Sequence, residues 1–146
     1  MIYYKFIKKC VAAKRKRPMI LTVETQARTQ MIDITQKVRR AVAESGASGG
    51  ICMLYVPHTT AAVTINESAD PSVRKDIVMI LNQIIPWESE YRHLEGNSPA
   101  HIKSVLVGAS ELLEIRDGQP VLGTWQGVFF CEFDGPRTRT LNIKIL

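Results

Sequence analysis

The residues best suited to chemistry gather in two short segments, residues 58–71 and residues 91–101. The first segment opens with a histidine and two threonines and ends with an asparagine, a glutamate and an aspartate, and the second holds the other two histidines. Both segments border apolar runs, so we expect them where strands and helices end. Catalytic and binding side chains are commonly presented by such element ends. The two segments therefore form the predicted functional region.

The three histidines are His58, His93 and His101. Three imidazoles can bind a transition metal and leave one position open for water or substrate, and imidazole favours Zn²⁺ over Mg²⁺. His93 and His101 are eight positions apart, whereas His58 is remote in the sequence. The alternative is that at least one of them is hydrogen-bonded at the end of a helix or strand.

Glu67 and Asp70 are three positions apart beside a predicted helix start. Asp70 precedes Pro71, an arrangement typical of a helix N-cap. Glu67 has no such role in the helix. It could act as a general base or, with Asp70, hold Mg²⁺ for a phosphorylated substrate that the helix N-terminus attracts.

Two arginines precede the apolar residues of the last predicted strand. Strand alternation places Arg137 and Arg139 on the same face as Leu141 and Ile143, so both guanidinium groups are expected to point inward and to need anions. Glu132 could pair with one arginine as a structural salt bridge, while a phosphate could pair with both.

The elements that position these residues follow from hydrophobic periodicity and from Gly, Pro and Asp at the boundaries. The apolar run at 51–56 lacks alternation, which predicts a strand covered on both faces. The predicted elements are a hairpin of strands 20–28 and 31–34, a helix 35–45 capped by Thr35 and ended by Gly46, strands 51–56 and 61–66, a helix from Pro71 to Pro86 packed on the sheet, a short helix from Pro99, and strands 110–116, 121–134 and 137–146, with a turn at Asp117–Gly118. This order predicts one α+β domain with a mainly antiparallel sheet.

The positive charge of the chain is concentrated at its start. The whole sequence of 146 residues has a net charge of +5, but residues 1–18 hold seven Lys or Arg and no acidic residue. We expect residues 1–18 to be a basic extension or an upstream-extended start, followed by a domain over 19–146. A nucleic-acid or membrane-surface arm is the alternative, and the domain itself shows no RNA-binding pattern, so a nucleic-acid partner is not expected.

Cysteine use and hydropathy indicate the compartment. Cys10, Cys52 and Cys131 form no C-x-x-C pair, and no apolar stretch is long enough to span a bilayer. The order of charged and apolar residues at the start argues against a secretory signal. A cytoplasmic protein without a membrane partner is expected.

Three strings, HTTAAVTINESADPSVRKDI, YRHLEGNSPAHIKSVLVG and LGTWQGVFFCEFDGPRTRTLNIKIL, together resemble the YjbQ family, often labelled secondary thiamine-phosphate synthase. The resemblance runs from about Ile20 to Leu146. It implies a compact α+β domain that assembles as a homotrimer. It also implies a polar pocket made by the motif positions His58, Thr59, Thr60, Asn66, Glu67, Asp70, His93, Asn97, His101, Gln126, Glu132 and Arg137.

The motif residues and the resemblance together yield a set of expected roles. His58, Glu67, Asp70 and Asn97 are the expected catalytic residues, and His58, His93 and His101 the expected metal ligands, for Zn or Mg. The expected substrate- and phosphate-binding residues are Thr59, Thr60, Asn66, Gln126, Glu132, Arg137 and Arg139.

Two functions follow from these roles. The first is a thiamine-phosphate synthase that joins hydroxymethylpyrimidine diphosphate to a thiazole phosphate and releases pyrophosphate. The second is a metal-dependent hydrolase or small-molecule-binding protein with a three-histidine site. In both, the ligand is a small molecule, and we expect the pocket near a subunit boundary because its residues lie at element ends.

Overall fold

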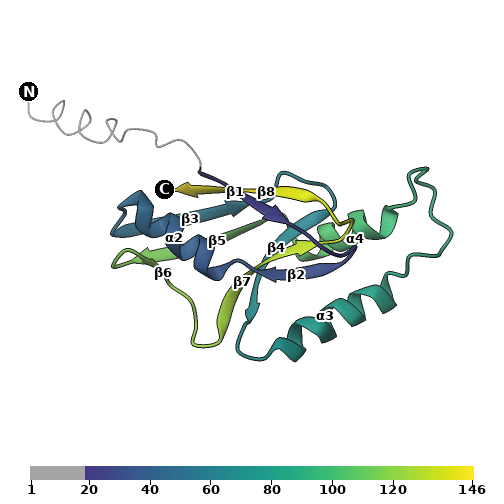
Figure 1. Ribbon diagram of the computed structural model, residues 1–146, viewed down its shortest axis with the longest axis horizontal. Coiled ribbons are helices and arrows are strands. Elements are labelled where there is room, and N and C mark those ends of the chain that lie inside the picture. The colour runs from purple at the N-terminus through teal and green to yellow at the C-terminus, as the bar shows by residue number, and fades with distance from the viewer. Residues whose placement is uncertain (1–18) are drawn as a thin grey trace, which may run out of the picture.

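The computed structural model describes residues 19–146 of the chain as two antiparallel sheets and three helices (Figure 1). The strands are β1 Met19–Glu24, β2 Gln30–Asp33, β3 Gly49–Tyr55, β4 Ala61–Glu67, β5 Ser110–Arg116, β6 Gln119–Pro120, β7 Gln126–Glu132 and β8 Thr138–Ile145, and the helices are α2 Thr35–Ser45, α3 Pro71–Ile84 and α4 Ser98–Val107. Five strands form one sheet in the order β1-β8-β3-β5-β6, and three form the other in the order β2-β7-β4. The predicted α+β fold is confirmed. The basic extension predicted for residues 1–18 lies outside the described residues.

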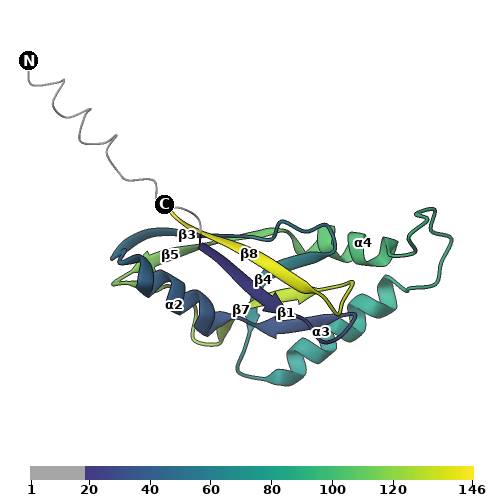
Figure 2. The same ribbon diagram turned by 45° about the horizontal axis from the view of Figure 1, so that its top comes forward.

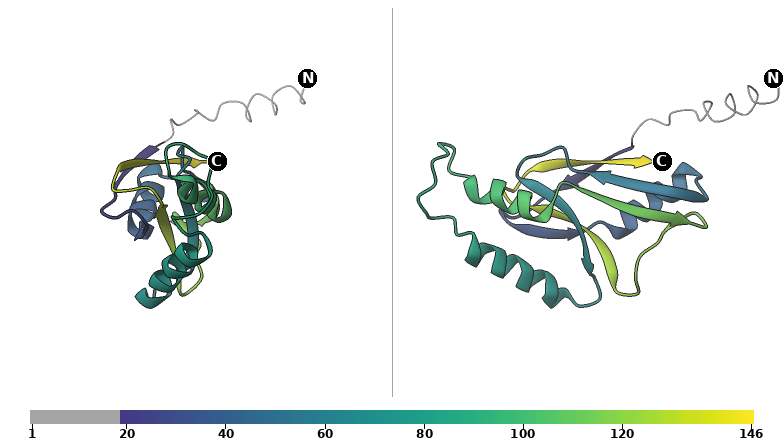
Figure 3. Two further views of the ribbon diagram at one scale, coloured as in Figure 1. Left: turned by 90° about the vertical axis from the view of Figure 1, so that its right-hand side faces the viewer. Right: turned by 180° about the vertical axis from the view of Figure 1, so that it is seen from behind.

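The two sheets enclose the main core. Alternate residues of the strands meet helix α2 there, among them Leu54, Phe130 and Leu141, which are all fully buried. A second, smaller cluster lies on the opposite side of the three-stranded sheet, where Phe129 and Phe133 pack against residues of α3 and α4. Figures 2 and 3 show these two helices on the outer side of that sheet, joined by a long loop. Strand β7 is therefore covered on both faces.

The predicted hairpin of the first two strands is wrong. β1 pairs with β8 in the larger sheet, and β2 pairs with β7 in the smaller one. Alternation identifies each strand correctly but carries no information about its partner. The connection between them crosses from one sheet to the other at Thr25, whose backbone N–H donates to the carbonyl of Arg137. This crossing brings the 25–29 loop beside the 134–137 loop.

The ends of α2 match the prediction only in part. Gly46 ends the helix in the left-handed conformation, with φ of 69°. The N-cap is Ile34 and not Thr35, because the Thr35 hydroxyl is used elsewhere. That hydroxyl donates to Asp33 Oδ1 and accepts a hydrogen bond from the backbone N–H of Val128, so it ties the helix to β7.

Two strand predictions also need correction. Among residues 19–146, β3 is covered on one face only: Cys52 and Leu54 are buried, whereas Tyr55 is exposed, because no described element packs on the outer side of the larger sheet. The run 121–134 is interrupted, since residues 121–125 form a loop between β6 and β7. The Asp117–Gly118 turn is confirmed, and both of its residues have positive φ, as a two-residue hairpin turn requires.

Helix α3 begins as predicted but packs less than predicted. Asp70 is its N-cap and accepts the Ser72 N–H at 2.8 Å. None of its residues is fully buried, and Ile80 and Ile84 are 46% and 62% exposed. Its apolar stripe is thus wider than the contact that one chain provides. None of the helices described is long and apolar enough to cross a membrane.

Candidate functional site

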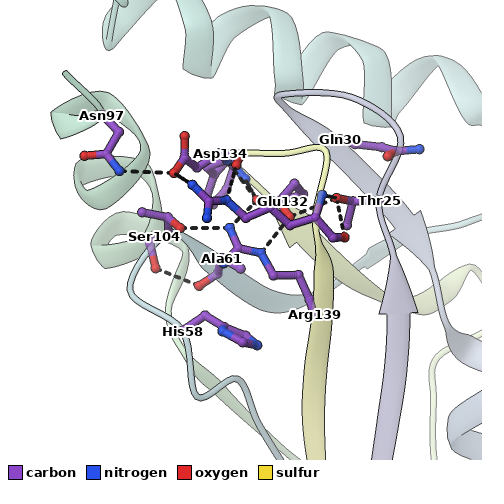
Figure 4. Close-up of polar contacts among 12 residues, drawn as sticks. Thr25, Gln30, His58, Ala61, Asn97, Ser104, Glu132, Asp134 and Arg139 are labelled. Carbon is purple, nitrogen blue, oxygen red and sulfur yellow. Dashed lines mark hydrogen bonds and ion pairs between the residues drawn. The ribbon is translucent and has the colours of Figure 1, made fainter. Parts of the chain in front are cut away.

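A buried ion pair between Glu132 and Arg139 lies at the centre of the polar residues (Figure 4). Arg139 donates from Nε and Nη2 to the two carboxylate oxygens of Glu132 at 2.7 and 2.6 Å, and from Nη2 to the Thr60 hydroxyl at 2.8 Å. Glu132 also accepts hydrogen bonds from the Thr25 hydroxyl and from the Phe133 N–H. Its carboxylate is fully buried. The sequence offered either Glu132 or a phosphate as the partner of the arginines, and for Arg139 the partner is Glu132.

The inward orientation predicted for the two arginines holds for Arg139 alone. The side chain of Arg137 is 55% exposed, and its guanidinium pairs with Asp134 at 2.8 Å. Arg137 precedes β8, so the strand alternation that places Arg139 inside does not extend to it. Its guanidinium instead faces the loop of residues 134–137.

His58 lies beside the buried pair, in the loop before β4. Its Nε2 accepts the Thr140 N–H at 2.9 Å, so in this arrangement the ring is neutral and carries its proton on Nδ1. Burial lowers the pKa of His58, and the Arg139 guanidinium lowers it further against the opposing effect of Glu132. The Nε2 lone pair is consequently engaged and unavailable to a metal while this hydrogen bond persists.

The other two histidines lie together. The rings of His93 and His101 meet edge to face with their centroids 5.3 Å apart, next to Tyr91 and Ser98. Within the described chain, no three His, Cys, Asp or Glu side chains are placed to hold a metal ion together. A three-histidine centre does not fit a single copy of this chain, and a metal at these residues would need ligands from a second copy.

A polar cleft of about 370 Å³ opens beside the loops that follow β1 and β7. Its lining residues are Arg28, Trp87, Glu95, Gly96, Asn97, Asp134, Gly135, Pro136 and Arg137. Asp134 Oδ2 accepts hydrogen bonds from both Asn97 Nδ2 and Arg137 Nη2, at 3.1 and 2.8 Å. The hydrogen bond to Asp134 fixes the orientation of the Asn97 side-chain amide, with Nδ2 directed toward Asp134.

The Asn97 oxygen has an unusual environment. Oδ1 is buried and accepts no hydrogen bond from any part of the chain that the structure describes. A buried acceptor without a donor costs free energy, and such groups normally have a partner in the functional protein. Asn97 was expected to be catalytic, and its placement in the cleft keeps that prediction open.

The remaining predicted residues lie at the opposite end of the smaller sheet. Glu67 pairs in register with Gln126, whereas Ala61, at the other end of β4, pairs with Glu132. The two ends are six residue steps apart along β7, which is about 20 Å of extended chain. Near Glu67, Asn66 Oδ1 accepts the Glu67 N–H and Gln126 Oε1 accepts the Gly123 N–H, and Asp70 caps α3. One chain therefore divides the predicted pocket into two separate groups.

Thr59 and Thr60 lie in different environments, although they are adjacent in the sequence. Thr60 is buried against Arg139, and Thr59 is exposed in the loop before β4. Thr60 thus belongs to the ion-pair network.

Three residues of the region were not among the predicted site residues. Arg28 lies over the indole of Trp87, 4.6 Å from the ring centroid, and the Lys103 Nζ lies 5.2 Å from the same ring. Lys103 is fully buried, donates to Asn82 Oδ1 at 2.6 Å, and burial lowers its pKa. No sequence signal distinguished Lys103, because a lysine in a helix is ordinarily solvated. Trp87 lines the cleft.

Comparison with known proteins gives a consistent result. Residues 19–146 match the family described as UPF0047 protein YjbQ-like. The UPF0047 protein of Methanocaldococcus jannaschii is 54% identical over 124 residues, which cover 85% of this chain and 90% of the relative. YugU of Bacillus subtilis is 51% identical over 127 residues, which cover 86% of this chain and 96% of the relative.

Solved structures agree with the sequence comparison. A YjbQ/UPF0047 crystal structure from Clostridium acetobutylicum superposes with a TM-score of 0.86 at 48% identity and covers 88% of this chain and 99% of its own. A YbjQ-like protein of Sulfolobus solfataricus superposes with a TM-score of 0.84 at 32% identity and covers 88% and 95%. Because the family model matches residues 19–146 and relatives are more than 50% identical over most of the chain, the chain belongs to the YjbQ-like UPF0047 family.

Proposed function

We propose that this protein binds a small phosphorylated molecule in the cleft lined by Asn97 and Arg137 and transfers a group from it. The observation that carries the proposal is the polar cleft itself, which two arginine side chains line together with Asn97, whose amide is held by Asp134. A small phosphate or diphosphate ester would match the charge and the hydrogen-bonding groups of this cleft.

The specific reaction to test is the formation of thiamine phosphate. In that reaction the bond between the pyrimidine methylene carbon and the diphosphate oxygen breaks, a bond from that carbon to the thiazole nitrogen forms, and pyrophosphate leaves. Arg137 would stabilise the negative charge that develops on the leaving group. Asn97 would orient the substrate through its side-chain amide.

The expected catalytic role of Glu67 and Asp70 requires a second subunit. They lie about 20 Å from the cleft along β7, by the rise of six strand residues. We propose that the protein is a homotrimer in which the Glu67 end of one copy approaches the Arg137 end of the next. A zinc ion bound by all three histidines would likewise need a second copy, whereas Mg²⁺ could be held by Glu67 or Asp70 together with the phosphates of the substrate.

The test is pyrophosphate release by the purified protein from the two thiamine precursors. We expect release by the parent protein and at least about a tenfold decrease for Asn97→Ala, since the cost of losing one positioned substrate hydrogen bond is of that order. Asn142→Ala is the matched control, because Asn142 pairs with Ile20 and Tyr55 on the outer face of the larger sheet.

Two outcomes would count against the proposal. Parent protein that releases no more pyrophosphate than Glu67→Gln protein would refute the synthase reaction. Asn97→Ala protein that binds and reacts like the Asn142→Ala control would remove Asn97, and the cleft with it, from the site.

A further inference from the structure

Arg28 differs from the other arginines of the polar region in its partners. Arg139 is engaged by Glu132, and Arg137 by Asp134. The guanidinium of Arg28 contacts the Trp87 ring and has no hydrogen bond or ion pair to another group in residues 19–146. Its donors are therefore available in the cleft.

The position of Arg28 is nonetheless well defined. The Gly135 N–H donates to the Arg28 carbonyl at 3.1 Å, which joins the 25–29 loop to the 134–137 loop that carries Arg137. A side chain at Gly135 would approach the Ala27 carbonyl to 2.5 Å, so the two loops are in close contact. Arg28 and Arg137 consequently line one cleft from two adjoining loops.

The Trp87 ring has a second cation beside it. Lys103 is fully buried, its Nζ lies 5.2 Å from the ring centroid, and its ammonium donates to Asn82. An indole ring attracts cations to its face and so offers a surface on which a guanidinium can lie. Arginine can lie on an aromatic ring with its face and still donate to an oxyanion with its edge.

We propose that Arg28 is a phosphate-binding residue of this cleft. Its guanidinium, held on Trp87, donates to the phosphate that Arg137 also contacts. The ligand class is a small phosphate or diphosphate ester. This inference rests on the proposed function and adds a residue to its site.

The test is calorimetric titration of the full chain with inorganic pyrophosphate and with methyl phosphate at low ionic strength. Arg28→Met should raise the Kd for pyrophosphate at least about tenfold, because it removes charge-assisted hydrogen bonds. Arg28→Lys, which keeps the charge but not the planar fork, should fall between Arg28→Met and the parent. Arg116→Met is the matched control: Arg116 is exposed, pairs with Glu114 on β5, and should leave the Kd unchanged.

Fluorescence supplies a second measurement. The chain has two tryptophans, so Trp125→Phe leaves Trp87 as the single indole. Pyrophosphate should change the Trp87 emission in this variant as Arg28 shifts toward the anion, and the change should be absent after Arg28→Met. Thermal unfolding of each variant establishes that the fold is retained.

The results separate this inference from the function on which it rests. Binding that is lost in Arg137→Met but unchanged in Arg28→Met would overturn the role of Arg28 and leave the cleft as the site. A parent protein that binds neither probe, or binding that is unchanged in both variants, would overturn both.

Discussion

At the scale of single residues, Glu132 is the side chain on which most of the polar network depends. It accepts from Arg139, Thr25 and the backbone of the 133–134 turn, and it is fully buried. Glu132→Gln would leave the guanidinium of Arg139 buried without a counter-charge. We expect the free energy of unfolding to fall by about 3–5 kcal/mol, measured by urea denaturation.

The control for this substitution is another glutamate paired with an arginine. Glu114→Gln removes the exposed partner of Arg116, and such surface pairs contribute about 1 kcal/mol or less. Equal losses in the two variants would mean that Glu132 does not act through the buried ion pair.

The lowered pKa of His58 predicts how the stability of the fold depends on pH. Its pKa is lowered in the folded protein, so the unfolded chain binds more protons between the lowered value and the ordinary value of about 6.5. Its contribution to stability is therefore complete above about pH 6.5 and decreases as the pH falls through the folded pKa.

The measurement is the free energy of unfolding of the parent and of His58→Asn between pH 5 and pH 8. Asparagine can accept the Thr140 N–H without titrating. The decrease in stability toward pH 5 should be smaller in the variant, and identical pH profiles would show that His58 is not the group responsible.

At the scale of the elements, the cleft depends on the close approach of two loops that follow different strands. A Cβ at Gly135 would lie 2.5 Å from the Ala27 carbonyl and 2.8 Å from the Thr25 hydroxyl. Gly135→Ala should therefore separate the loops and lower the melting temperature by several degrees, which corresponds to about 1–3 kcal/mol of overpacking. Gly49→Ala is the control, since its Cβ would meet only the Ile115 carbonyl at an ordinary 3.7 Å. If both variants melt at the parent temperature, the loops are not in tight contact.

At the scale of the whole molecule, two features indicate that several copies of the chain assemble. They are the separation of the predicted site residues and the exposed apolar side of α3 and α4. Ile84, Val105 and Leu106 are 62%, 82% and 63% exposed in one chain. Exposed apolar surface of this kind marks interaction sites, and a closed ring of copies would cover it. We expect light scattering to give about three times the chain mass of 16.4 kDa. Ile80→Glu, on α3, should lower that mass.

Mixing inactive variants tests whether the site spans a boundary. Glu67→Gln and Arg137→Met each remove one end of the proposed pocket. Unfolded together and refolded, they should regain part of the pyrophosphate binding or release, because some boundaries combine an intact Glu67 with an intact Arg137. A monomeric protein, or mixtures no better than their components, would contradict a shared site.

The sequence alone determined most of the elements and several of their ends. Asp70 and Gly46 delimit helices through hydrogen bonds and backbone angles that act within a few residues, and alternation along the last strand placed Arg139 inside correctly. These features are local, so the chain carries their signal directly. The family motifs likewise identified the fold over residues 19–146.

Only the tertiary structure decided which of these elements meet. Strand pairing separated β1 from β2 and set Glu67 and Glu132 at opposite ends of one sheet, because hydrogen-bond partners are chosen by burial across the whole chain. The cleft residues Arg28, Trp87 and Arg137 come from three distant segments, and Lys103, next to Trp87, looks like any solvated helical lysine until packing buries it. The chain's chemistry-bearing residues can thus be named from local pattern, but their grouping depends on long-range packing that no short stretch of sequence encodes.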